Sequence, residues 1–258
     1  MPRKVIAFDL DGTLAPSKSP VPDRMVAALD GLLEHYHVLV MSGGKFEQFQ
    51  KQLLSSLKVE PAKLERLHLM PTCGTRYYHY DVVKGEWVKV YAEDFTADEK
   101  AKIIDALQKV VAELGYVEKK TYGEIIEDRG SQITWSVLGQ DIVDALGEEG
   151  LRLKEAWDPD NAKKNKVRDA AALLLPEFEV RVGGITSVDI TRPGIDKGYG
   201  MQKLLDMMEI GKDEVIFIGD RLKEGGNDYP VKAMGVDCME ISYWHETALA
   251  VEAIVAVA

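Results

Sequence analysis

This chain of 258 residues has little cysteine, and it lacks long apolar runs and net positive charge. Its only two cysteines, Cys73 and Cys238, are too few for a disulfide framework or a cysteine-based zinc site. Such scarcity is typical of a reducing cytoplasm, where we expect this protein to reside. No apolar run is long enough to cross a membrane, and we find no signal peptide before the first strand-like segment.

The charge balance is acidic. The chain has 32 lysines and arginines against 43 aspartates and glutamates, which gives a formal net charge of −11. This balance argues against nucleic acid or an anionic membrane as a partner. An anionic substrate would need a few local cations or a metal ion to offset the background field. With 46% hydrophobic residues, the chain can bury the core of one large domain or of two modest ones.

The most informative stretch runs from Val5 to Leu14. Its first four residues form a continuous apolar run, which predicts a strand buried on both faces of a parallel sheet. Asp9 and Asp11 follow, and their spacing of two places both carboxylates on one side of the strand end. Gly12 then permits a sharp turn. A pair of acids alone could be an ordinary exposed turn, but the carboxyl end of a parallel strand is where α/β sheets bind ligands.

Three further apolar runs, at residues 37–41, 67–70 and 215–218, predict more strands of the same sheet. The first of them leads through a Gly-rich turn into a predicted helix at 46–57. Backbone amides and a hydroxyl in such a turn can hold phosphate oxygens, although most turns of this kind are only structural. The candidate site residues that follow or flank the predicted strands are Ser42, Gly43, Lys197, Asp220, Asn227 and Asp228.

The middle of the chain has a different pattern. Segments at 77–80 and 87–91, and again at 124–127 and 132–137, alternate in the manner of antiparallel hairpins. A capping box, Thr96 to Glu99, opens a helix between them, and a strand follows at 177–182. We therefore predict an α/β fold with a Rossmann-like parallel sheet at residues 1–80 and 184–258. An inserted α+β domain would occupy residues 81–183.

The candidate site is rich in carboxylates. Several acids at one sheet edge repel one another unless a cation lies among them, and oxygen ligands alone favour Mg²⁺. A carboxylate in that setting can attack phosphorus, and a second one two residues on can move a proton. Lys197 would offset negative charge on nucleophile and phosphate, while Ser42 and the amides beside it, including that of Gly43, would hold phosphoryl oxygens.

These residues resemble the four motifs of the haloacid dehalogenase-like superfamily, in the right order and over nearly the whole chain. The motifs are the segment 8–14, the strand-end Ser42, Lys197 and the segment 219–228. The resemblance implies that Asp9 is the nucleophile and Asp11 the acid and base. It also implies that Mg²⁺ is held by Asp9, the Asp11 carbonyl and Asp220. Asn227 and Asp228 would then shape the outer shell of the metal.

The inserted domain looks like the large cap of the sugar-phosphatase branch, and within that branch the chain is most similar to eukaryotic-type phosphomannomutases. The residues that carry this likeness are the segments 11–16, 126–130, 183–189, 194–197 and 225–228. It implies that Arg129 grips a distal phosphate or sugar, and that Ser187 and Asp189 face the other end of the substrate. From the residues alone, Arg129 could also be a solvated hairpin residue and Asp189 a structural hydrogen-bonding group.

Two departures from the mutase pattern bear on the reaction. Gln140 and Lys18 stand where the mutases carry arginines. A mutase must hold a second phosphate while a bisphosphorylated intermediate turns round, and bidentate arginines do this better than glutamine or lysine.

We therefore predict a Mg²⁺-dependent phosphatase acting on a sugar phosphate or similar small phosphorylated metabolite, as a monomer or homodimer. The alternatives are a phosphohexomutase and a binding protein that keeps the fold without catalysis.

Overall fold

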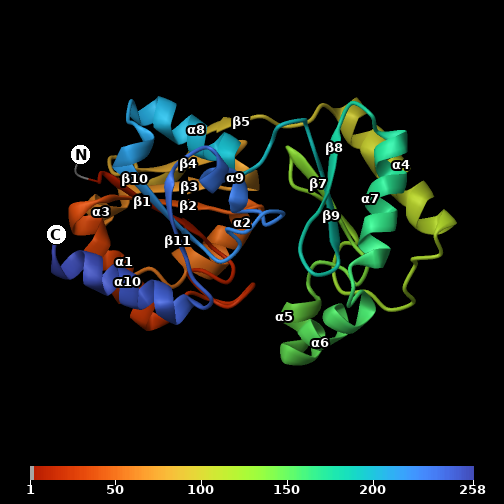
Figure 1. Ribbon diagram of the computed structural model, residues 1–258, viewed down its shortest axis with the longest axis horizontal. Helices are drawn as coiled ribbons and strands as arrows, with labels where there is room; N and C mark the ends of the chain where they lie inside the picture. The colour runs from red at the N-terminus through yellow and green to blue at the C-terminus, as the bar shows by residue number, and fades with distance from the viewer. Residues whose placement is uncertain (1–2) are drawn as a thin grey trace. The chain divides into compact units, whose positions relative to one another are not determined.

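The computed structural model describes residues 3–258, which form two compact units. Unit 1 runs to Ala92 and resumes at Ile195, and unit 2 comprises Glu93–Gly194 (Figure 1). The chain thus leaves unit 1 once and returns to it once, as expected for an inserted domain.

Unit 1 is built on a seven-stranded sheet in the order β11-β10-β1-β2-β3-β4-β5. The pairs from β11 to β3 are parallel, whereas β4 pairs antiparallel with β3 and β5 antiparallel with β4. The strands are β1 (Val5–Asp9), β2 (His37–Met41), β3 (Leu67–Met70), β4 (Arg76–Asp81), β5 (Glu86–Ala92), β10 (Val215–Gly219) and β11 (Asp237–Glu240).

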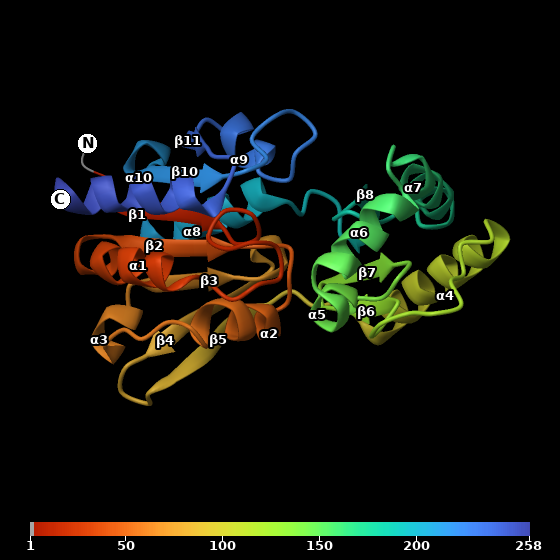
Figure 2. The ribbon, with the colours of Figure 1, turned by 90° about the horizontal axis from the view of Figure 1, so that it is seen from below.

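Helices cover both faces of this sheet. On one face α1 and α10 lie side by side and pack with Ile6, Phe8 and Val40 (Figures 1 and 2). On the other face α8 packs its Met201 and Leu204 against the strands. The helical elements of unit 1 are α1 (Asp23–His35), α2 (Phe46–Phe49), a π-helical turn (Gln50–Leu54), α3 (Pro61–Leu64), α8 (Lys197–Met208), α9 (Tyr229–Ala233) and α10 (Trp244–Ala256), with short 3₁₀ turns at Thr72–Gly74 and Lys212–Glu214.

Unit 2 has its own four-stranded antiparallel sheet, in the order β6-β7-β9-β8. Ile133, Trp135 and Val188 face α4 and α7, with which they form a separate apolar core. The predicted capping box is present, since Thr96 accepts from the Glu99 amide and the Glu99 carboxylate accepts from the Thr96 amide. The elements are α4 (Ala97–Glu113), β6 (Ile126–Asp128), β7 (Gln132–Ser136), α5 (Ile142–Leu146), α6 (Glu148–Trp157), α7 (Ala162–Leu174), β8 (Glu179–Val182) and β9 (Ser187–Thr191).

The predicted fold class is confirmed, but the domain boundaries at 80/81 and 183/184 differ from those of the two compact units, 92/93 and 194/195. The hairpin β4–β5 extends the sheet of unit 1, and β9 pairs with β7 and β8 in unit 2. Period-two alternation identifies a strand but not the sheet that it joins, and the predicted boundaries therefore place β5 and β9 in the other unit. In place of the helix predicted at 46–57, the structure has the short helix α2, which continues as the π-helical turn and ends at Leu54. None of the helices among residues 3–258 combines the length and the apolar character that a membrane span requires.

Three of the five histidines lie together on the α8 face of the unit 1 sheet. His68 is buried and both of its ring nitrogens are engaged: Nε2 lies 3.0 Å from His37 Nδ1, and Nδ1 lies 2.8 Å from the Tyr77 hydroxyl. Burial, with the neighbouring His37 and His79, lowers the pKa of His68 to about 3. Burial, Arg66 and His79 also lower the pKa of His37.

This cluster should make the fold sensitive to acid. Below about pH 6.5 His68 binds a proton in the unfolded chain but stays neutral in the folded chain, because its folded pKa is lower. Stability should therefore fall by about 1.4 kcal/mol per pH unit until the folded pKa is approached. Urea unfolding between about pH 7 and about pH 5 should show a shallower loss in His68→Gln than in the wild type. His245→Gln, at an exposed histidine, should keep the wild-type slope. Equal slopes in all three proteins would contradict this prediction.

Candidate active site

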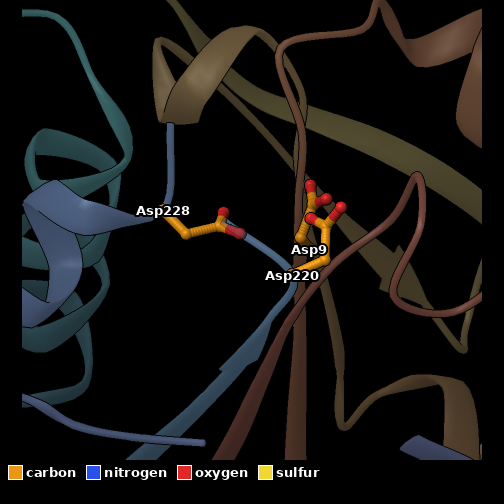
Figure 3. A group of neighbouring side chains, drawn as sticks. All are labelled: Asp9, Asp220 and Asp228. Atoms are coloured by element: carbon orange, nitrogen blue, oxygen red, sulfur yellow. The ribbon is translucent and has the colours of Figure 1, made fainter. Parts of the chain in front are cut away.

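Charged side chains meet at the carboxyl edge of the unit 1 sheet. Asp9 ends β1, Asp220 directly follows β10, Asp228 precedes α9 and Lys197 begins α8. The strand order reverses beside β1, because β2 and β3 lie on one side of it and β10 and β11 on the other. In open α/β sheets this point of reversal is where ligands bind. Figure 3 shows the carboxylate of Asp228 directed toward those of Asp9 and Asp220, which extend in the same direction.

Lys197 forms the centre of a buried ion triad. Its ammonium lies 2.5 Å from Asp9 Oδ1 and 2.5 Å from Asp228 Oδ1. The lysine and Asp228 are fully buried, and Asp9 is 4% exposed. The other Asp228 oxygen accepts from the Arg221 amide at 3.0 Å. The triad therefore ties together β1, α8 and the loop after β10, which are far apart in the sequence.

The electrostatics of the triad are set by burial. Desolvation raises the pKa of Asp9 to about 7, because together with Asp228 and Asp11 it outweighs the attraction of Lys197. Desolvation opposes the charge of Lys197, but Asp9 and Asp228 outweigh it and raise the pKa of the lysine. The lysine therefore stays charged, while the carboxylates carry more negative charge than one ammonium can balance. A second cation would favour the ionised form of Asp9.

Asp220 completes a group of carboxylates that could hold a metal ion. One oxygen each of Asp9, Asp220 and Asp228 lies within 4.8 Å of the others. Asp220 Oδ1 is buried and has no hydrogen-bond partner among residues 3–258. Burial, reinforced by Asp228, raises the pKa of Asp220. A set of oxygen donors with unused acceptor capacity fits a hard divalent cation. Gly12 makes room for this carboxylate, since a Cβ there would lie 2.6 Å from Asp220 Oδ2.

The structure holds Asp11 apart from this group. Its Oδ1 accepts from the Lys18 amide at 2.6 Å and from Gln52 at 3.1 Å, and its Oδ2 accepts from Gln48 at 2.7 Å. Gln48 and Gln52 are also bonded to each other at 2.7 Å. Neither glutamine was predicted from the sequence. Their spacing of four on one helical face is the signal that could have identified them.

The predicted phosphate-binding turn lies between β2 and α2. Ser42 is buried, and its Oγ accepts from the Gly44 amide at 3.1 Å. Because the hydroxyl oxygen acts as an acceptor in this contact, its hydrogen can be donated to an anionic oxygen of a ligand. Asn227, by contrast, is exposed, whereas its neighbour Asp228 is buried within the carboxylate group.

The candidate residues of unit 2 lie on or beside the polar face of its sheet, opposite α4 and α7. Arg129 Nε donates to Glu127 at 2.7 Å, and a terminal nitrogen donates to Gln140 Oε1 at 3.3 Å. The Arg129 side chain is only 12% exposed, which excludes the alternative that Arg129 is a solvated hairpin residue. Asp189 accepts from Thr134 at 2.7 Å, and burial raises its pKa against the opposing charge of Arg129. Ser187, which is also buried, is its neighbour on β9.

Comparisons with known proteins agree with this architecture. A family model for haloacid dehalogenase-like hydrolases matches residues 6–230. Phosphomannomutases of Schizosaccharomyces pombe and Encephalitozoon cuniculi are 28% and 24% identical to this chain over 240 and 238 residues. Both alignments cover 89% of this chain, and 85% and 84% of the relatives. A solved structure of a truncated, IMP-bound IMP-nucleotidase of Plasmodium falciparum has a TM-score of 0.69 at 16% identity. The superposition covers 99% of this chain and 68% of the nucleotidase chain.

The fold and the site define a Rossmann-like α/β protein with an inserted cap and a cluster of acids at the strand ends. The chain belongs to the haloacid dehalogenase-like hydrolase family, and it is similar in sequence to phosphomannomutases. The likeness to the nucleotidase, at its low identity, concerns the fold alone.

The buried triad predicts a large stability cost when its cation is removed. Lys197→Met leaves Asp9 and Asp228 facing each other without a counter-charge, so we expect a loss of about 3–5 kcal/mol at neutral pH. Urea unfolding should show this loss, and the added change Asp228→Asn should restore part of it. Lys223→Met, at an exposed lysine, should change stability by less than about 0.5 kcal/mol. A Lys197→Met protein as stable as this control would contradict the role given to the triad.

Proposed function

We propose that this protein is a Mg²⁺-dependent phosphatase that hydrolyses a sugar phosphate or a similar small phosphorylated metabolite through an aspartyl-phosphate on Asp9. The observation that carries the proposal is the buried Asp9 carboxylate, held by Lys197 at 2.5 Å beside Asp220 and Asp228. A buried carboxylate fixed at a strand end, with a cation on one oxygen, is suited to in-line attack on a phosphoryl group.

The reaction would run in two displacements. Lys197 binds Oδ1 of Asp9, so we assign Oδ2 to the attack on phosphorus. The new O–P bond forms as the bond to the ester oxygen breaks, and Asp11 gives its proton to the departing alcohol. Asp11, now ionised, takes a proton from water, whose oxygen attacks the phosphoryl group and releases phosphate and free Asp9. Gln48 and Gln52 would hold the Asp11 carboxylate in place for both transfers.

A divalent cation would be held by Asp9, Asp220 and the Asp11 carbonyl. Asp228 would lie outside, because Lys197 and the Arg221 amide occupy both of its oxygens. The orphaned oxygen of Asp220 supports this assignment. When bound, Mg²⁺ would supply positive charge for the phosphoryl oxygens. Lys197 would supply more, and the Ser42 hydroxyl with the Gly43 amide would bind the remaining oxygens.

Unit 2 would select the substrate. We assign the part of the substrate remote from the reacting phosphate to Arg129, Ser187 and Asp189. Glu127 balances the charge of Arg129 at 2.7 Å, and Gln140 adds no charge. Such a face suits sugar hydroxyls better than a second phosphate, which favours hydrolysis over phosphate transfer within a sugar. The similarity to phosphomannomutases favours the second candidate, a phosphohexomutase.

One assay separates the two candidates. The protein is given mannose 1-phosphate, Mg²⁺ and a catalytic amount of a hexose bisphosphate, and both free phosphate and hexose 6-phosphate are followed. We expect free phosphate without isomerisation, and neither product from Asp9→Asn. Hexose 6-phosphate without free phosphate would establish the mutase. A broad panel of phosphate esters would then identify the preferred substrate of a phosphatase. Inactivity across that panel with Mg²⁺ would favour a binding protein.

Metal binding has its own prediction. Because the cation binds only the folded site, Mg²⁺ at about a hundredfold excess over its Kd should stabilise the protein by about 2.7 kcal/mol. Thermal unfolding should show this shift in the wild type and a much smaller one in Asp220→Asn. Asp213→Asn, at an exposed acid, should shift as the wild type does. If Asp220→Asn shows the same Mg²⁺-dependent shift as the wild type, Asp220 is not a ligand of the metal.

A further inference from the structure

The turn that follows β3 has an unusual backbone. Thr72, Cys73 and Gly74 have φ angles of 49°, 56° and 84°, so three successive residues adopt left-handed conformations. Glycine tolerates this region, but cysteine is disfavoured there and a β-branched threonine more so. Such strain persists only where the surrounding contacts require it, and it gathers at functional sites.

The amides of this turn hold the predicted phosphate-binding turn. The Cys73 amide donates to the Ser42 carbonyl at 3.0 Å, and the Thr72 amide donates to the Gly44 carbonyl at 3.0 Å. In a trans peptide the carbonyl of one residue and the amide of the next point in opposite directions. The bond from Cys73 to Ser42 therefore also fixes the direction of the Gly43 amide, which we assign to the phosphoryl oxygens.

The same turn packs against the helix that carries Lys197. A Cβ on Gly74 would lie 2.4 Å from the Gly200 Cα, and a Cβ on Gly200 would lie 2.7 Å from the Cys73 carbonyl oxygen. Backbone therefore meets backbone one helical turn after Lys197. The Tyr91 hydroxyl donates to the Gly74 carbonyl at 2.8 Å and anchors the turn from β5.

The hydroxyl of Thr75 closes the turn. It donates to the Thr72 carbonyl at 2.7 Å and lies 2.7 Å from the Thr72 hydroxyl. These contacts hold Thr72 in its left-handed conformation. A φ angle directs the chain that follows it, so a negative φ at Thr72 would turn the Cys73 amide away from the Ser42 carbonyl. A negative φ at Cys73 would move Gly74 away from helix α8 and so displace the whole turn.

We propose that the left-handed turn Thr72–Gly74 is a positioning element, which sets the Ser42–Gly44 turn, and with it the Gly43 amide, against helix α8 and its Lys197. This inference rests on the proposed function, since it assigns the phosphate-binding turn a bound phosphoryl group. Cys73 acts through its backbone and not through its thiol. A residue that tolerates the left-handed region should therefore replace it, whereas a β-branched residue should not.

The test compares Cys73→Asn and Cys73→Gly with Cys73→Val, at a temperature where all are folded. The asparagine and glycine variants should keep kcat and the inhibition by inorganic phosphate within about twofold of the wild type, since both residues tolerate this backbone. The valine variant should lose at least about tenfold in kcat and bind inorganic phosphate correspondingly more weakly, because the Ser42–Gly44 turn and its Gly43 amide are displaced.

Glu209→Val is the matched control. Glu209 has φ 52° at the end of α8 and is exposed, so valine imposes the same backbone penalty outside the site. It should lower stability without changing kcat or the inhibition by phosphate. If Cys73→Val also loses only stability, the turn is merely structural and the inference is wrong.

Calorimetric binding of inorganic phosphate in the presence of Mg²⁺ separates this inference from the proposed function. A wild type that binds phosphate but hydrolyses no ester would overturn the proposed function. The positioning role would then be judged on phosphate binding alone, with the same order of variants expected. A wild type that neither hydrolyses esters nor binds phosphate would overturn both.

Discussion

The contact on which the site depends is the buried ammonium of Lys197 between the carboxylates of Asp9 and Asp228. Charges placed out of water are costly unless they are paired and hydrogen-bonded, so this triad holds β1, α8 and the loop after β10 in one arrangement. One ammonium cannot balance all the neighbouring carboxylates, and one oxygen of Asp220 has no hydrogen-bond partner in the described part of the chain. The site is therefore organised internally and still receptive to a cation.

Around the triad, neutral hydrogen-bond donors hold the other groups of the site. Gln48 and Gln52 donate to the two carboxylate oxygens of Asp11 and keep this side chain apart from the carboxylate group. Backbone amides and one hydroxyl form the turn at Ser42, and the strained turn at Cys73 holds it in place through hydrogen bonds to its carbonyls. On the sheet of unit 2, Glu127 balances Arg129 and leaves a polar face of low net charge.

Much of this could be predicted from the sequence, because the determining signals are local. Continuous apolar runs identified β1, β2, β3 and β10, and their ends located Asp9, Ser42 and Asp220. What failed depends on tertiary pairing. Alternation identified β4 and β5 as strands but could not say which sheet they join, and the predicted boundaries placed β5 and β9 in the other unit. Nor could spacing reveal that Lys197 bridges Asp9 to Asp228, or that Thr72 and Cys73 adopt positive φ without an asparagine or glycine to announce it.

The central claim is that Asp9 becomes covalently phosphorylated during turnover. The most direct measurement mixes a phosphate ester in slight excess with Mg²⁺-loaded protein, quenches in acid within the first turnover, and maps the peptides by mass spectrometry. The account predicts one phosphoryl group on Asp9, at an occupancy that rises and then decays as free phosphate appears. Release of phosphate at the same rate with no phosphoryl group on Asp9, or with the group on another residue, would contradict it.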